Sequence, residues 1–358
     1  MFEIANRLVG RGHEVTITTL DNEANCRWFP LKAQVVGLDV LTRPRPLRAM
    51  SKVLRIASHD LIVRHRDWRL NARDNYIELL ARRMPECDAN IATYCLTAFS
   101  VFRSGKGVPF YHMQHYEPFF FDDPYLVKLA EESYSLPMHK IVNSMWLQKL
   151  MRQKYGIELP RVTHGTFNLD LFSRTRFRGT KAARRVVAMG KDTPWKGLHD
   201  LLDAMRIVFQ ERRDVDLFLY GSGIKTMSDV PYTYVHNPTD DQLGQLYSSA
   251  DVMVMPSWYE SFPNPPLEAM ACGVPVVTTR DGTEEFAIDQ KTALVVPPRN
   301  PQAMARAILR VLSDEQLRLT LSMNGPNMAN KFDWDTTTNQ LEAILQEKLR
   351  SDERRFRA

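Results

Sequence analysis

The feature that most constrains the fold is the alternation of short apolar or β-branched runs with longer segments of helical period. Segments such as 144–155 and 197–211 carry apolar residues at the three- and four-residue spacing of an amphipathic helix. Alternation of this kind is typical of parallel α/β sheets covered by helices. We therefore predict an α/β fold with strands at residues 14–20, 35–41, 89–94, 108–112, 140–143, 185–189, 216–220, 232–236, 251–255, 274–278 and 293–296.

The chain is too long for one compact core, because 358 residues correspond to roughly two domains. Residues 173–184 are rich in Arg, Lys, Ser, Thr and Gly, which indicates a linker. We predict one doubly wound, Rossmann-like domain in residues 1–172, a second in 185–330, and a closing helix in 331–358 that crosses back to the first domain. Ligands of such domains bind at the carboxyl ends of the strands, so we expect a cleft between the two.

The amino-terminal segment departs from this plan. Residues 2–9 have the pattern of an amphipathic helix and lead directly into the predicted strand 14–20. A doubly wound domain normally opens with a strand and a glycine-rich turn. We therefore expect the first strand of this domain to be missing.

Composition narrows the class of protein. Hydrophobic residues make up 44% and charged residues 25%, which excludes wholesale disorder. No apolar run reaches the roughly 18–20 residues of a membrane-spanning helix, and no secretory signal is visible. The four cysteines form no C-x-x-C pair, as expected of a reduced, cytoplasmic protein. The net charge of +5 favours anionic partners.

The most informative region is 247–285. The predicted strand 251–255 leads into a loop with Glu260 and then into a helix that begins near two prolines, with Asn264 as a candidate N-cap. Glu268 lies eight residues after Glu260, in the first turn of this helix. Taken singly, Glu260 is equally well explained as a solvated loop acid, and Glu268 as an acid that complements the positive helix end.

The residues around these two acids favour a functional interpretation, because they resemble the donor-domain signature of the family-four retaining glycosyltransferases. That signature reads approximately P-S-x-x-E-G-F-G-x-x-x-x-E-A-x-A-x-G-x-P-V-V. The matching residues are Pro256, Ser257, Glu260, Phe262, Glu268, Ala269, Ala271, Gly273, Pro275, Val276 and Val277. The resemblance covers most of the chain and implies the GT-B fold, in which two Rossmann-like domains face each other and the second binds a nucleotide-sugar.

A second stretch resembles the same family. Gly190, Lys191, Lys196 and Gly197 match its glycine-arginine and lysine-glycine pairs, four residues apart, with Lys191 in place of arginine. Departure of a nucleoside diphosphate develops about two negative charges, which such basic groups can stabilise. Lysine keeps the charge of arginine but not its bidentate geometry.

The resemblance implies a role for each charged group. Lys191 and Lys196 would neutralise the diphosphate, Glu260 would hold hydroxyls of the transferred sugar, and Glu268 would accept hydrogen bonds from the ribose. His115, in a segment similar to the family's V-P-V-V-x-T-x-H, would line the sugar pocket from the first domain.

Further donor contacts are implied at Gly190, Gly221, Phe262, Pro263, Asn264, Leu267 and Glu285. Gly221 matches a G-x-G near the nucleobase, and Glu285 matches the family's G-x-P-E, where it supports the loop or contacts the donor. The family's E-G-F-G is Glu260-Ser261-Phe262-Pro263 here. Proline has no N–H, so this loop offers fewer donors to a diphosphate.

No metal or other cofactor is expected. Asp214-Val215-Asp216 resembles a D-x-D metal motif but leads straight into a strand, so we interpret it as strand entry. Residues 43–83 carry eleven basic side chains with few acids between them. This segment is either a solvated helical face or a surface that docks on anionic lipid. Nucleic acid is not an expected partner, since no recognition module accompanies the charge.

The sequence therefore predicts a retaining glycosyltransferase that uses a nucleotide-sugar donor and a glycan or lipid-linked acceptor, in cell-surface polysaccharide synthesis, with the protein cytoplasmic or peripheral on the inner face of the membrane. Residues 114–120 resemble bacterial rhamnosyltransferases of this family, which implies deoxythymidine-diphosphate rhamnose as donor; a UDP- or GDP-sugar remains open. Two alternatives also remain open: a sugar-nucleotide epimerase, and a truncated or degenerate protein that binds nucleotide without turnover.

Overall fold

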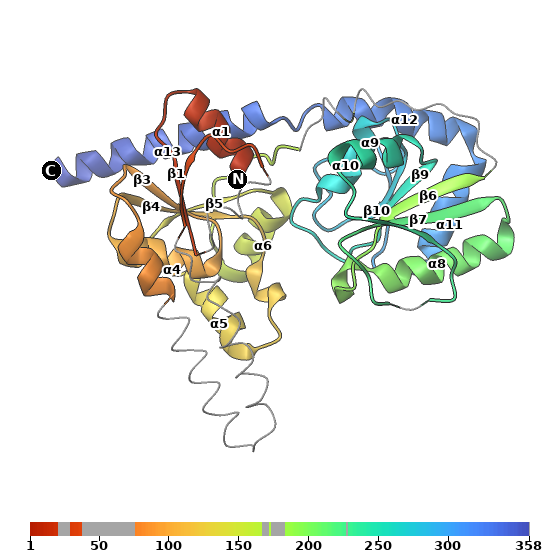
Figure 1. The fold of residues 1–358 in the computed structure, drawn as a ribbon, viewed down its shortest axis with the longest axis horizontal. Helices are drawn as coiled ribbons and strands as arrows, with labels where there is room; N and C mark the ends of the chain where they lie inside the picture. Colours follow the sequence, from red (N-terminus) through yellow and green to blue (C-terminus); the bar gives the residue numbers. More distant parts are fainter. Residues whose placement is uncertain (21–28, 38–75, 167–171, 173–182, 227, 358) are drawn as a thin grey trace, which may run out of the picture. The chain divides into compact units, whose positions relative to one another are not determined.

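The computed structural model describes residues 1–20, 29–37, 76–166, 172, 183–226 and 228–357 (Figure 1). These residues divide into two compact units, each described here by itself. The first unit is Met1–Val142 with Thr338–Ala358, and the second unit is Asn143–Thr337. The basic segment 43–83 lies outside the described residues as far as residue 75, and the predicted linker 173–184 is described only from residue 183.

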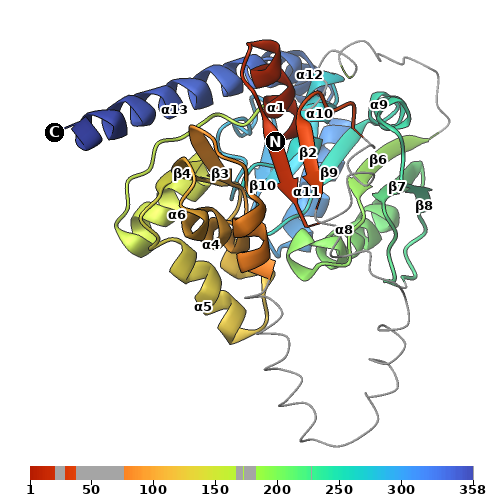
Figure 2. The same ribbon diagram turned by 60° about the vertical axis from the view of Figure 1, so that its left-hand side comes forward.

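The first unit contains parallel strands in two sheets. Strands β1 (Thr16–Thr19) and β2 (Gln34–Gly37) form one pair, after helix α1 (Phe2–Gly10). A second sheet has the order β3-β4-β5, and helix α4 packs against β3 and β4 with α5 alongside it (Figure 2). The bounds are β3 Ala89–Ala92, α4 Cys95–Ser104, β4 Val108–Met113, the 3-10 turn η3 Glu117–Phe120, α5 Pro124–Ser133 and β5 His139–Val142.

The second unit is built on a six-stranded parallel sheet with the order β11-β10-β9-β6-β7-β8. From β6 the chain proceeds outward through β7 to β8, and from β9 it proceeds outward in the other direction through β10 to β11. This is a doubly wound sheet whose direction of winding reverses between β6 and β9. The strand bounds are β6 Arg184–Met189, β7 Val215–Gly221, β8 Thr233–His236, β9 Val252–Met255, β10 Val276–Thr279 and β11 Leu294–Val296.

Helices cover both faces of this sheet because successive strand residues point to opposite sides. Val186 and Ala188 pack on one face with α8 and α11, whereas Val187 packs on the other with α9 and α10 (Figure 1). Both faces are apolar, as the continuous hydrophobic runs of parallel strands require. The helix bounds are α8 Leu198–Glu211, α9 Asp240–Ser248, α10 Asn264–Ala271, α11 Pro301–Ser313 and α12 Glu315–Ala329.

Two helices lie next to the boundaries between the units. Helix α6 (Met145–Tyr155) groups with the second unit, although the predicted domain range 1–172 would place it in the first. Helix α13 (Trp334–Arg357) joins the first unit from Thr338 onward. There Glu342 receives a hydrogen bond of 2.6 Å from Arg11. None of the helices within the described residues is long and apolar enough to cross a membrane.

Every predicted strand that falls within the described residues is confirmed, and its ends shift by no more than two residues. Residues 2–9, predicted as an amphipathic helix, form α1, with Ile4 and Ala5 buried.

Candidate active site

The loops that carry the predicted charged residues meet where the winding of the second unit reverses. Strands β6 and β9 are neighbours and parallel, so the loops after them leave the same edge of the sheet. The loop after β6 contains Lys191 and Lys196, and the loop after β9 contains Glu260. Such a point is where doubly wound sheets bind ligands, because the neighbouring loops diverge to opposite faces.

A close backbone approach fixes the loop after β6 against the end of β9. The turn η4 (Pro194–Lys196) is followed by Gly197, whose φ of +68° lies in the left-handed region. A Cβ at Gly197 would lie 2.1 Å from the Pro256 carbonyl oxygen, so only glycine fits. The amide of Trp258 also donates to the Trp195 carbonyl at 2.7 Å. Lys191, at the start of this loop, is exposed.

Lys196 and Glu260 are in direct contact. The Lys196 ammonium lies 2.6 Å from Glu260 Oε1, with side-chain exposures of 18% and 9%. The Glu260 backbone is fixed separately, because its N–H donates to the Asp281 carbonyl at 3.0 Å and Gly282 packs against it too closely for any side chain. The carboxylate is therefore held on a rigid backbone beside a cation.

Aromatic residues precede both members of this ion pair in the sequence, Trp195 before Lys196 and Tyr259 before Glu260. Tyr259, next to Glu260, lies parallel to Trp195 and Trp146 with ring centroids 6.1 Å and 6.2 Å away. Trp258 donates its indole N–H to Asp200 at 2.5 Å, and the Arg299 guanidinium lies 3.9 Å from the centroid of the Trp258 ring. The contact between the Trp195 and Tyr259 rings thus joins the loop after β6 to the loop after β9.

The helix after Glu260 begins one residue earlier than predicted. Asn264, predicted as the N-cap, is the first residue of α10, and Pro263 is the N-cap. Asn264 Oδ1 is buried and has no hydrogen-bond partner among the described residues. One contributing reason is that Pro266, two residues later, has no N–H, so a capping side chain at Asn264 could accept only from Leu267.

Glu268 lies on α10 and is buried, at 8% exposure. Its Oε2 accepts a hydrogen bond of 3.1 Å from the Tyr247 hydroxyl, and that hydroxyl is 2.6 Å from the hydroxyl of Tyr220. Burial raises the pKa of Glu268 to about 7, against the opposing effect of the Tyr247 hydrogen bond. Glu268 is thus held by two tyrosines that hydrogen-bond in series.

The other residues of the second unit that were predicted to contact the nucleotide-sugar differ in whether a ligand could reach their side chain or only their backbone. The side chains of Phe262 and Leu267 are buried in the apolar core, which leaves their backbone groups. Glu285 contacts Arg161 in an ion pair and accepts from the Met145 N–H at 2.6 Å, so it braces the start of α6. The remaining three are Gly190, which follows β6, Gly221, which ends β7, and the capping Pro263.

His115 belongs to the first unit, just after β4. It is half-buried, its ring lies 4.7 Å from that of Phe120, and its Nδ1 is 3.2 Å from the Tyr116 carbonyl. The neighbouring Glu117 is 2% exposed and accepts from the Tyr111 hydroxyl at 2.7 Å. Burial raises the pKa of Glu117 to about 7.

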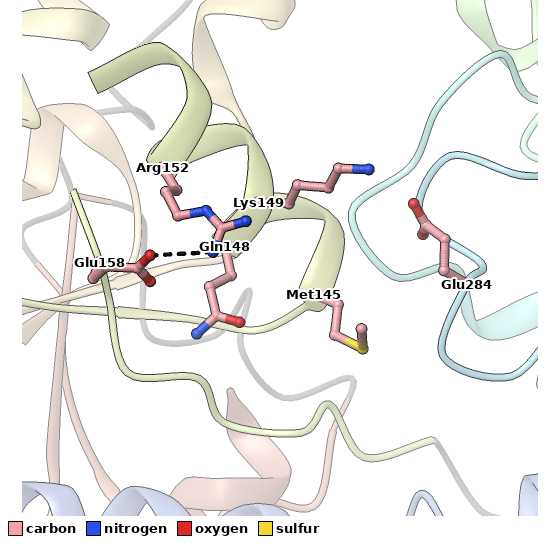
Figure 3. Close-up of a pocket in the computed structure, with 6 residues that line it drawn as sticks. All are labelled: Met145, Gln148, Lys149, Arg152, Glu158 and Glu284. Atoms are coloured by element: carbon pink, nitrogen blue, oxygen red, sulfur yellow. Dashed lines mark hydrogen bonds and ion pairs between the residues drawn. The ribbon is translucent and has the colours of Figure 1, made fainter. Parts of the chain in front are cut away.

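A pocket of about 280 Å³ lies beside α6 in the second unit (Figure 3). Its lining residues are Met145, Gln148, Lys149, Arg152, Glu158 and Glu284. Figure 3 shows Lys149 extending toward the segment that carries Glu284, while Arg152 pairs with Glu158. Because charges of both signs line it, the pocket does not select an anionic ligand.

The described residues contain no group of three or more His, Cys, Asp or Glu side chains placed to hold a metal ion. In the D-x-D string, Asp214 pairs with Arg212 at 2.9 Å and β7 begins at Val215, which confirms the interpretation as strand entry.

Sequence reasoning missed the groups that hold the predicted residues in place. Tyr247 and Tyr220 support Glu268, and Gly282 supports Glu260. No local pattern marks the two tyrosines, and the G-x-P-E match that includes Gly282 does not reveal its contact with Glu260, because each contact joins segments that are distant in the chain.

Part of the second unit resembles proteins of a known family. Residues 183–314 match the family described as Glycosyl transferases group 1. The chain is 29% identical over 204 residues to a D-inositol 3-phosphate glycosyltransferase of Corynebacterium urealyticum, covering 52% of this chain and 48% of that protein. It is 39% identical over 112 residues to the protein of the same name from Salinispora arenicola, covering 31% and 25%. The chain thus spans about half or less of the length of these relatives.

Solved structures resemble nearly the whole chain. A sucrose-phosphate synthase from Thermosynechococcus elongatus has a TM-score of 0.70 at 20% identity, covering 98% of this chain and 92% of that one. HepE of Anabaena, solved with UDP-glucose, has a TM-score of 0.70 at 19% identity, covering 97% and 94%. These likenesses confirm the predicted architecture. The chain therefore has the GT-B fold, and residues 183–314 of its second unit match the model of the group 1 glycosyl transferases.

Proposed function

We propose that this chain is a retaining glycosyltransferase that moves a sugar from a nucleoside diphosphate donor to a hydroxyl of a glycan or lipid-linked acceptor. The observation that carries the proposal is the contact of 2.6 Å between Lys196 and Glu260 at the point where the winding of the sheet reverses. A cation and a carboxylate at one point match a substrate in which a phosphate adjoins a polyhydroxylated ring.

Each charged group has a task in this reaction. The bond between the anomeric carbon and the phosphate oxygen breaks, and a bond from the acceptor oxygen to that carbon forms on the same face. Lys191 and Lys196 stabilise the charge that develops on the diphosphate, at about 1.5–3 kcal/mol for each charge-assisted hydrogen bond. The departing phosphate oxygen receives the acceptor proton, so we assign no general base.

Two carboxylates position the donor in this proposal. Glu260 accepts from sugar hydroxyls, and Glu268 accepts from ribose hydroxyls. In the first unit, His115 contacts the transferred sugar. The N-cap and first turn of α10 contribute few N–H groups, because three of the residues in 263–266 are prolines.

Two observations bear on the identity of the sugar donor. HepE has been solved with UDP-glucose and with UDP and glucose, which favours a UDP-sugar. Residues 114–120 favour deoxythymidine-diphosphate rhamnose. The acceptor and a membrane-peripheral location through residues 43–83 remain part of the proposal.

The test is a transfer assay with UDP-, GDP- and dTDP-sugars and a panel of glycan and lipid-linked acceptors. We expect Lys196→Ala and Glu260→Ala to abolish transfer while the folded state persists. Matched controls are Lys291→Ala and Glu315→Ala, which remove exposed charges of the same sign elsewhere in the second unit. Wild-type turnover in Lys196→Ala or Glu260→Ala would refute the assignment.

The same assay without acceptor separates the alternatives. Formation of an epimerised nucleotide-sugar would support an epimerase on this fold. Nucleotide binding with neither transfer nor hydrolysis would support a protein that binds nucleotide without turnover.

A further inference from the structure

We propose that Tyr247 is a positioning residue for nucleotide binding: its hydroxyl holds Glu268 Oε2, so that Oε1 faces the ligand, and Tyr220 in turn orients Tyr247. This inference rests on the proposed function, because it takes the ligand of Glu268 to be the nucleotide. It adds two residues that the family resemblance does not assign.

The contacts form an unbranched chain through the interior of the second unit. Tyr220 lies near the carboxyl end of β7, Tyr247 lies on α9, and Glu268 lies on α10. Tyr247 is 0% exposed and Tyr220 is 5% exposed, so water does not replace these hydrogen bonds. The two distances are 2.6 Å between the hydroxyls and 3.1 Å from Tyr247 to Glu268 Oε2.

The number of protons on these groups fixes which one donates in each of the two hydrogen bonds. Each phenol has one proton to donate, and an ionised carboxylate can only accept. With Glu268 ionised, Tyr247 donates to Oε2, and its oxygen can then accept only from Tyr220. Within the part of the chain that the structure describes, the hydrogen bond from Tyr247 to Oε2 is the one that the Glu268 carboxylate receives. The arrangement therefore uses one carboxylate oxygen for support and leaves the other for ligand hydroxyls.

The protonation of Glu268 then links nucleotide affinity to pH. Burial raises the pKa of this carboxyl to about 7, the hydrogen bond from Tyr247 lowers it, and Asp240 at the start of α9 raises it. The other titratable groups coupled to Glu268 are Tyr220 and Cys272, whose own pKa values are raised mainly by burial. Because only the ionised form accepts at both oxygens, nucleotide affinity should fall as the pH drops below about 7.

The experiment measures the affinity of UDP, GDP and dTDP by calorimetry across about pH 5.5–8.5, a range that brackets the Glu268 pKa. We expect Tyr247→Phe to weaken binding at neutral pH by about tenfold or more, the worth of one hydrogen bond to a charged group. Its pH midpoint should also move upward, since the variant loses a bond to the ionised form. Tyr220→Phe should move the midpoint in the same direction by less.

Two controls separate this effect from a loss of packing. Tyr134→Phe removes one hydroxyl from an equally buried tyrosine of the first unit and should leave the affinity and its midpoint unchanged. Glu268→Gln should abolish the pH dependence. Should Tyr247→Phe fail to fold, Tyr220→Phe alone tests the hydrogen bonds that lead to Glu268. An unchanged midpoint in both tyrosine variants would overturn the inference.

A second readout separates failure of this inference from failure of the proposed function. Carboxyl-carbon NMR of labelled glutamate gives the Glu268 pKa without any nucleotide. A raised pKa in Tyr247→Phe, with no binding of any nucleotide by the wild type, would keep the supporting role and refute the proposed function. Nucleotide binding by the wild type, with an unchanged Glu268 pKa in both tyrosine variants, would refute the supporting role of the tyrosines and keep the proposed function.

Discussion

Replacing Gly197 by alanine tests whether the contact between the loops after β6 and β9 builds the site. A left-handed backbone costs an alanine about 1–2 kcal/mol relative to glycine. A Cβ at this position would lie 2.1 Å from the Pro256 carbonyl oxygen and 2.8 Å from its carbon, inside any permitted contact. Overpacking of this kind costs about a further 1–3 kcal/mol. We therefore expect Gly197→Ala to lower the free energy of unfolding by about 2–5 kcal/mol.

The second unit supplies a matched control for the backbone term. Gly156, after α6, has a φ of +66° against +68° for Gly197, and a Cβ there would have no atom within 4 Å. Gly156→Ala should therefore lose only about 1–2 kcal/mol. Unfolding of both variants in urea, followed by tryptophan fluorescence, gives the difference.

The alanine side chain should also displace Lys196 and slow sugar transfer, because Gly197 follows Lys196 directly. A shift of about 1 Å in a positioning group can cost about a hundredfold in rate. Sugar transfer should thus fall steeply in Gly197→Ala and stay near wild type in Gly156→Ala. Equal losses of stability and of activity in the two variants would refute this account of the loop contact.

The remaining predictions concern buried acids. The pKa of Glu117 is raised to about 7 by burial, so its contribution to stability is complete below about pH 4.5 and is lost as the pH rises to about 7. Glu117→Gln removes this dependence, and its free energy of unfolding relative to wild type should rise over that window, by at most about 1.4 kcal/mol per pH unit; a flat difference in urea titrations would contradict it. Glu285→Gln keeps the acceptor for the Met145 N–H but loses the ion pair with Arg161, so thermal unfolding should show a loss of about 1.5–3 kcal/mol. If Glu285 only braces α6, nucleotide affinity should not change; a matching loss of affinity would instead indicate a donor contact.

The second unit could be predicted from the sequence in some detail. The strand that became β9 and the helix that became α8 have the apolar periodicities of their elements, and these are local properties of a chain. The spacing of Glu260 and Glu268 likewise placed one on a loop and the other on a helix. The predicted N-cap of α10 was wrong by one residue; Pro266 removes one of the two N–H groups from which a capping side chain at Asn264 could accept.

The sequence by itself thus determined the order of the elements and the loops that carry the charged residues, whereas the strand order, with its reversal of winding between β6 and β9, came from the structure. Only the tertiary structure decided what those residues touch: Lys196 on Glu260, Tyr247 on Glu268, and Gly197 against Pro256. The reason is that the hydrogen bonds and close approaches which fix a side chain depend on segments far apart in the chain. Such contacts follow from the packing of helices and strands, and no short-range pattern of residues encodes them.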